Sequence, residues 1–210
     1  MPHAVLLGDS IFDNAAYVPG GPPVIDQLKA GLPLGWKATL LAVDGDTTDM
    51  VAVRLAGLPA DATHLMVSVG GNDALMHIDL LAAEHNILPE MSAARAEFAD
   101  RYRAMLDAVL TAERPTAICT VYDAIPGLTA EARTALATFN DVILREAARA
   151  RLPVLDLRLV CDDPGDYSPL SPIEPSAQGG AKIAALVASV VTGHDFARRE
   201  CVVYGKAGGG

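Results

Sequence analysis

The chain has 210 residues, of which 51% are hydrophobic, and its formal net charge at pH 7 is −10. This length and apolar content predict one domain with a sizeable core over residues 1–204, followed by a disordered tail over 205–210. The acidic balance argues against nucleic-acid binding and against binding to an anionic membrane surface, because both need a basic face.

The chain lacks the patterns that mark membrane spans, leaders and cofactor sites. It has no run of 18 apolar residues and no basic start followed by an apolar stretch and a cleavage site, so we expect no membrane span and a cytoplasmic location. No glycine-rich nucleotide loop follows a strand, so we expect no cofactor. Three cysteines without metal-ligand spacing, Cys119, Cys161 and Cys201, indicate reduced structural thiols and no metal site.

Apolar runs alternate with helical periodicity along the chain. The runs predict five strands, at His3–Gly8, Lys37–Val43, His64–Val69, Ala117–Val121 and Val154–Leu157. The helices expected between and after them are Val24–Ala30, Thr48–Leu55, Ala74–Ala83, Ala93–Ala112, Ala130–Ala150 and Ser176–Val191. Strands that alternate with helices predict a three-layer α/β fold with a doubly wound parallel sheet, in the flavodoxin-like order 2-1-3-4-5.

The first strand ends at Gly8, Asp9 and Ser10. A tight turn at this glycine places the hydroxyl of Ser10 at the carboxyl edge of the sheet, where open α/β sheets carry their chemistry. Ser10 is therefore the candidate nucleophile, although a serine in such a turn often only caps a helix.

The next two strands also end in residues that suit this edge. Gly45 follows the second strand and Asn72 follows the third, and the order 2-1-3 makes these strands neighbours of the first. The backbone N–H groups of Ser10 and Gly45 and the side-chain amide of Asn72 can then form an oxyanion hole. Both Gly45 and Asn72 also fit simple turn positions, and that interpretation stays open.

Four segments, at Gly8–Asp13, Asp44–Thr48, Val67–Asp73 and Ile173–Ala184, stand in the order of the conserved blocks of one family. Together the chain from residue 4 to residue 184 resembles the SGNH or GDSL hydrolases, a superfamily of lipases and esterases. The resemblance implies a serine hydrolase that acts on a small-molecule ester through Ser10.

The last segment departs from the pattern of the family. The family reads Asp-x-x-His-Pro there, with the histidine as base and the aspartate orienting it. Pro175 fixes the alignment in this chain, so Glu174 stands at the histidine position and Ser171 at the aspartate position. The resemblance therefore covers Ser10, Gly45 and Asn72, but it supplies no His–Asp pair.

No histidine is well placed to replace the missing base. Two of them begin predicted strands and lie at the opposite edge, and one follows the last helix, about 24 Å from its start. His77, about one helical turn after Asn72, is the only one that could swing near Ser10. The histidines of the chain are His3, His64, His77, His85 and His194.

Glu174 is the remaining candidate base. A carboxylate with a pKa of about 4.3 is a weak base, but burial beside Ile173 and Pro175 would raise that pKa and improve it. The sequence thus predicts a Ser10–Glu174 dyad. The alternative is that Glu174 only favours a helix start, and that the chain binds an acyl or glycan ligand without turning it over.

Two further interpretations concern acidic residues. Asp44 and Asp46 also resemble the Asp-x-Asp-x-Thr signature of haloacid-dehalogenase-type phosphatases, but the lysine that this family needs is absent between Lys37 and Lys182. A late group of acids is expected to be solvated loop residues rather than catalytic ones: Asp162, Asp163 and Asp166.

The stretch from Met76 to Met91 is expected to shape an acyl pocket. Its apolar residues could equally belong to the core. The lining candidates are Leu80, Leu81, Ile87 and Leu88.

Overall fold

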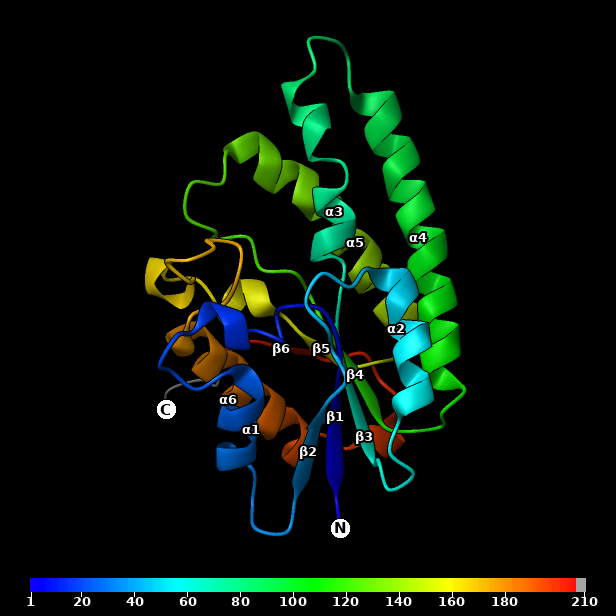
Figure 1. Ribbon diagram of the computed structural model, residues 1–210. Coiled ribbons are helices and arrows are strands. Elements are labelled where there is room, and N and C mark those ends of the chain that lie inside the picture. The colour runs from blue at the N-terminus through cyan, green and yellow to red at the C-terminus, as the bar shows by residue number, and fades with distance from the viewer. Residues whose placement is uncertain (207–210) are drawn as a thin grey trace.

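The computed structural model describes residues 1–206 and contains one parallel sheet of six strands (Figure 1). The strand order is β2-β1-β3-β4-β5-β6. This confirms the predicted fold class and strand order, with one strand more than the sequence indicated. The strands are β1 (His3–Gly8), β2 (Lys37–Leu40), β3 (His64–Ser68), β4 (Thr116–Cys119), β5 (Val154–Leu155) and β6 (Val203–Tyr204).

Four strand predictions needed correction at an end, and a sixth strand was not predicted. Strand β3 ends at Ser68 instead of Val69, and β4 spans Thr116–Cys119 instead of Ala117–Val121. Strand β2 stops at Leu40 because the N–H groups of Leu41 and Ala42 both donate to the carbonyl of Leu6, which interrupts the ladder. Strand β5 stops at Leu155 because the side chain of Asp156 caps a 3₁₀ turn that follows it. Strand β6 was missed because two residues are too short to form a periodic pattern.

The long helices lie close to the predicted ranges, and α5 has the predicted bounds. The expected helix over Ala74–Ala83 is wrong, since it is divided between α3 and a 3₁₀ turn at Ile78–Ala82. Helix α4 begins at Leu88 rather than Ala93, with Pro89 in its first turn, where proline is tolerated. The helices are α1 (Val24–Gly31), α2 (Thr48–Arg54), α3 (Gly71–Leu75), α4 (Leu88–Leu110), α5 (Ala130–Ala150) and α6 (Ala177–Gly193).

Helices cover both faces of the sheet and create two apolar cores (Figure 1). Alternate side chains of β1 point to opposite faces: Ala4 and Leu6 pack with α1 and α6, whereas Val5 and Leu7 pack with α2, α4 and α5. Burial on both faces explains why the strands are continuous apolar runs. Among residues 1–206, no helix is both long and apolar enough to span a membrane.

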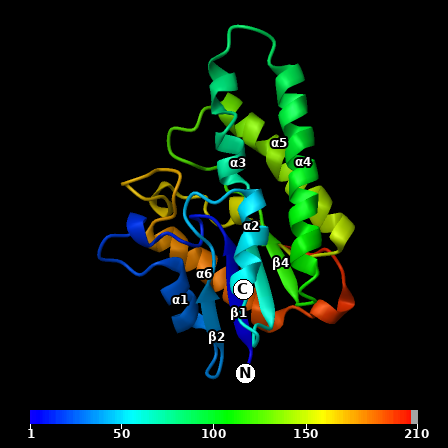
Figure 2. The same ribbon diagram turned by 45° about the vertical axis from the view of Figure 1, so that its right-hand side comes forward.

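The amino-terminal half of α4 and the segment before it extend beyond the carboxyl ends of the strands (Figures 1 and 2). Helix α3 follows β3 directly at this end of the sheet. The N-terminus lies at the opposite end. The segments that carry Ser10, Gly45 and Asn72 follow β1, β2 and β3 and therefore gather at the carboxyl edge of the sheet.

Candidate active site

The turn that carries Ser10 is built tightly against β3. Gly8 has a φ of 127°, and a Cβ at this position would lie 1.7 Å from the carbonyl oxygen of Ser68, so only glycine fits. The side chain of Asp9 accepts a hydrogen bond of 3.1 Å from the N–H of Ile11 and closes the turn. Ser10 therefore sits at the end of β1, with 6% of its surface exposed.

Hydrogen bonds join the ends of the three neighbouring strands. The N–H of Val43 donates to the carbonyl of Gly8, which ties the end of β2 to the Ser10 turn. The side-chain amide of Asn72 donates to the carbonyl of Asp46 at 2.9 Å, which ties α3 to the turn of Gly45. The topology thus brings the Ser10, Gly45 and Asn72 segments to one place on the sheet edge.

Two backbone donors at this place are unused. Within residues 1–206, neither the N–H of Ser10 nor that of Gly45 has a hydrogen-bond acceptor. One N–H of the Asn72 amide is taken by Asp46, which leaves its second one. The arrangement can supply three N–H donors to a negatively charged oxygen.

Glu174 lies in the loop before α6, with 5% of its surface exposed. Burial raises the pKa of its carboxyl group, the neighbouring hydroxyl of Ser10 lowers it, and the charge of Asp44 raises it. Within the described residues, Oε2 of Glu174 is buried without a hydrogen-bond partner. This carboxylate oxygen can therefore still take up a proton.

Ser171, at the aspartate position of the family, contributes through its backbone. Its carbonyl oxygen accepts a hydrogen bond of 3.0 Å from the N–H of Glu174. It thereby shapes the loop instead of orienting a base through its side chain.

Within residues 1–206, no histidine forms a hydrogen bond with Ser10 or Glu174, and each contacts other side chains. His77 packs against Phe139, with ring centroids 6.0 Å apart. The ring of Phe196 contacts both His64 and His194, which places His194 near the amino ends of the strands. The side chain of His3 contacts Asp61 and Thr39, and that of His85 contacts Glu90.

Two buried carboxyl groups beside the site were missed by sequence reasoning. Burial raises the pKa of Asp9 to about 8, against the hydrogen bond from Ile11, and the charges of Glu174 and Asp73 raise it further. Burial also raises the pKa of Asp73, although the N–H and hydroxyl of Thr48 donate to it. Their positions next to Ser10 and Asn72 were the only available signal. The raised pKa favours the neutral form of Asp9, which reduces the negative charge beside Glu174.

An apolar pocket adjoins the site. Two lining residues, Gly71 and Ile173, are the chain neighbours of Asn72 and Glu174, and the opposite wall comes from α5. Of the four lining residues expected from the sequence only Leu81 contributes. Leu80, Ile87 and Leu88 do not line it: Leu80 lies in a 3₁₀ helix instead of the expected α-helix, and Leu88 begins α4 with its side chain exposed. The other lining residues are Ala74, Leu75, His77, Ile78, Met91, Val121, Ile125, Leu128, Ala132, Ala135, Leu136 and Phe139.

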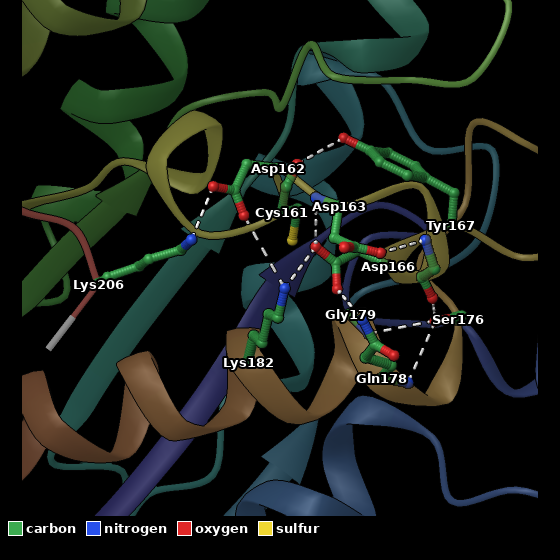
Figure 3. Close-up of polar contacts among 11 residues, drawn as sticks. Cys161, Asp162, Asp163, Asp166, Tyr167, Ser176, Gln178, Gly179, Lys182 and Lys206 are labelled. Atoms are coloured by element: carbon green, nitrogen blue, oxygen red, sulfur yellow. Dashed lines mark hydrogen bonds and ion pairs between the residues drawn. The ribbon is translucent and has the colours of Figure 1, made fainter. Parts of the chain in front are cut away.

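The late acidic residues have different environments. Asp162 and Asp163 are exposed, as expected, and Asp162 pairs with Lys206 at 2.6 Å. The prediction that Asp166 is solvated was wrong: its side chain is fully buried and pairs with Lys182 at 2.7 Å (Figure 3). Of the expected tail over 205–210, residues 207–210 lie outside the described part of the chain.

Asp44 and Asp46 are both engaged by neighbouring side chains. The hydroxyl of Tyr17 donates to Asp44 at 2.7 Å. Arg54 forms two hydrogen bonds with the carboxylate of Asp46, at 2.7 and 2.9 Å. No group of three or more potential metal ligands occurs within residues 1–206. All three cysteines are free, with Cys119 and Cys161 buried and Cys201 exposed.

The fold and the residues at its carboxyl edge define an α/β protein of the SGNH-hydrolase type. The sequence profile of the GDSL-like lipase/acylhydrolase family matches residues 6–182, and the chain belongs to this family. The phosphatase interpretation of Asp44 and Asp46 is therefore set aside. No curated protein sequence matches the chain.

Solved structures of the same fold include several hydrolases. A lipase/acylhydrolase from Enterococcus faecalis is 21% identical, with 92% of this chain and 96% of that chain covered and a TM-score of 0.66. An α/β hydrolase enzyme, LAE5, from the metagenome of Lake Arreo is 20% identical, with 91% and 95% covered and a TM-score of 0.67. An acetyl xylan esterase from Geobacillus stearothermophilus, in a W215I variant, is 18% identical, with 91% and 94% covered and a TM-score of 0.65.

Proposed function

We propose that this protein hydrolyses carboxylic esters through a Ser10–Glu174 dyad, with Gly45 and Asn72 completing the oxyanion hole. The observation that carries the proposal is the buried Glu174 carboxylate, which has an unpartnered oxygen and lies beside the hydroxyl of Ser10. Membership of the lipase/acylhydrolase family supports ester hydrolysis in general.

In the proposed reaction Glu174 accepts the proton of the Ser10 hydroxyl as Oγ attacks the ester carbonyl carbon. The carbonyl oxygen becomes negatively charged and is stabilised by the N–H groups of Ser10, Gly45 and Asn72. Collapse of this intermediate releases the alcohol, which receives the proton from Glu174. Water then attacks the acyl-serine, with Glu174 again accepting a proton. As the bond to Ser10 breaks, Oγ receives this proton from Glu174 and the carboxylic acid is released.

The raised pKa of Glu174 makes this role chemically reasonable. A general base is most effective when its pKa lies near the pH of the solution. Burial raises the pKa of Glu174 in this direction. Only its deprotonated form is a base, so activity should rise with pH through the pKa of Glu174, above the ordinary value of 4.5.

The surroundings of the site favour an ester with an apolar acyl group. The pocket beside Gly71 and Ile173 is lined almost entirely by apolar side chains and suits a hydrocarbon chain. The charge of Asp44 lies near Glu174. Its carboxylate accepts a hydrogen bond from the hydroxyl of Tyr17, and its N–H donates to the carboxylate of Asp13. These acidic groups favour an alcohol without negative charge.

The decisive experiment treats the protein with a serine-reactive fluorophosphonate and locates the adduct by peptide mass. We expect the adduct on Ser10 and turnover of short-chain aryl esters, with neither in Ser10→Ala. An unlabelled wild-type protein that binds but does not hydrolyse esters would select the binding-only alternative. The double variant Glu174→His with Ser171→Asp restores the residue types of the family triad and should retain or increase turnover.

A further inference from the structure

We propose that Asp166 and Lys182 are positioning residues that hold the Glu174 loop in place relative to Ser10. The inference rests on the proposed role of Glu174 as base. It concerns a buried ion pair that lies outside the catalytic groups and ties this loop to helix α6 (Figure 3).

The segment 167–175 is a closed loop with Glu174 at its carboxyl end. Tyr167 and Pro175 form an antiparallel bridge, and the N–H of Ser168 donates to the carbonyl of Glu174 at 2.8 Å. Below this bridge, the N–H of Ser176 donates to the carbonyl of Asp166 at 2.8 Å. Asp166 therefore stands where the loop begins, opposite Ser176, which caps α6.

Both carboxylate oxygens of Asp166 accept hydrogen bonds. Oδ2 accepts hydrogen bonds from Nζ of Lys182 at 2.7 Å and from the N–H of Asp163 at 3.0 Å. Oδ1 accepts one from the side chain of Gln178 at 3.0 Å. Two of these three donors, Lys182 and Gln178, belong to α6, as Figure 3 shows. Side chains therefore attach the start of the loop to this helix.

The backbone of Asp166 also fits closely against α6. A Cβ at Gly179 would lie 2.1 Å from the carbonyl oxygen of Asp166, so the first turn of the helix can approach only because this residue is glycine. Helix α6 itself packs through Ile183 and Val187 into the core under the sheet. A series of packing contacts and hydrogen bonds thus runs from the sheet through α6 and Asp166 to the loop of Glu174.

These contacts determine where the carboxylate of Glu174 lies. The side chain of Lys182 is 32% exposed, but that of Asp166 is fully buried, and a buried carboxylate without its cation is unfavourable in this position. Without Lys182, Asp166 and the start of the loop are expected to move away from α6. A displacement on the order of 1 Å between catalytic groups can reduce a rate about 100-fold.

The test compares Lys182→Met with Lys206→Met. Lys206 belongs to the same polar cluster, but it pairs at the surface with Asp162 and should be dispensable. With kcat expressed per serine titrated by fluorophosphonate, we expect Lys182→Met to lower kcat roughly 10- to 100-fold with KM within about twofold. Lys206→Met should match wild type, and Lys182→Arg, which keeps the cation, should recover most of the loss.

Amide hydrogen exchange provides a second readout that does not depend on turnover. Lys182→Met should accelerate exchange in segment 167–175, whereas Lys206→Met should not. If Lys182→Met fails to fold, Gln178→Ala removes one donor from an exposed side chain and should show a smaller change in the same direction. Wild-type exchange together with wild-type kcat in the folded variants would overturn the inference. An inactive, unlabelled wild type would instead overturn the proposed function, and the exchange result would still decide whether the ion pair holds the loop.

Discussion

The two halves of the candidate site are positioned in different ways. Ser10, Gly45 and Asn72 follow strands β1, β2 and β3, and parallel pairing aligns Gly8 with Ser68. Glu174 does not follow a strand directly. Its loop is held by the Tyr167–Pro175 bridge and by side-chain contacts of Asp166, where the loop begins. Strand pairing thus positions the proposed nucleophile and oxyanion donors, whereas the proposed base lies on a loop outside the sheet that side chains attach to α6.

This contrast explains why the departure from the family pattern falls at the base. The turns at the strand ends allow few substitutions, since a side chain at Gly8 would collide with Ser68. A loop outside the sheet can accept Glu174 in place of histidine while the sheet stays unchanged. The contrast yields four predictions, in order of decreasing expected effect.

The largest effect is expected for Glu174→Gln, which keeps the size of the side chain and removes its basicity. Turnover should fall about 10²- to 10⁴-fold, the usual contribution of a general base. In wild type, kcat/KM should decrease as the pH falls through the raised pKa of Glu174, because the protonated carboxyl cannot accept the proton of Ser10. Ester hydrolysis measured across the pH range checks both points.

The exposed Glu131, at the start of α5, offers a matched control for this substitution. Glu131→Gln should leave activity unchanged. Full activity of a folded Glu174→Gln protein would exclude the dyad, and His77 in the neighbouring pocket would become the next candidate.

The second prediction concerns the half of the site fixed by topology. Asn72→Ala removes an N–H donor that stabilises charge only as the reaction proceeds, so kcat should fall about 10²- to 10³-fold with little change in KM. Steady-state kinetics provide the test, with the exposed Asn86→Ala as control. A change confined to KM would reassign Asn72 to substrate binding.

The sequence predicted the strands, helices and strand order much better than the contacts between side chains that are distant in the chain. Apolar runs marked β1 and helical periodicity marked α5 with the observed bounds, and both signals are local. The burial of Asp166 depends on Lys182, sixteen positions later in the same chain, and no local pattern carries that information. The pocket was predicted in the correct region, but its α5 wall is formed by residues remote in sequence.

The third prediction uses that wall. Ala135 is a half-buried residue of α5 that lines the pocket, so Ala135→Phe should reduce the space for an acyl chain. We expect kcat/KM to fall about tenfold for longer acyl esters, in the range that a few methylene contacts contribute, and to change little for acetyl esters. A series of aryl esters of increasing chain length measures this shift. The exposed Ala137→Phe on the same helix should leave the chain-length profile unchanged.

The smallest effect is expected for Arg54→Met, which tests the contrast directly. Arg54 holds the carboxylate of Asp46, but the Asn72 amide is bound by the carbonyl of Asp46, and the backbone of this turn is already tied to β1 through Val43. Loss of the salt bridge should therefore lower kcat only about threefold, because backbone hydrogen bonds keep the donor geometry in place although the Asp46 carboxylate is buried like that of Asp166. The comparison is with Lys182→Met, in kcat per titrated serine, with the exposed Arg133→Met as control. If Arg54→Met lowers kcat as much as Lys182→Met does, side chains position the oxyanion donors as strongly as they position Glu174, and the distinction between the two halves of the site does not hold.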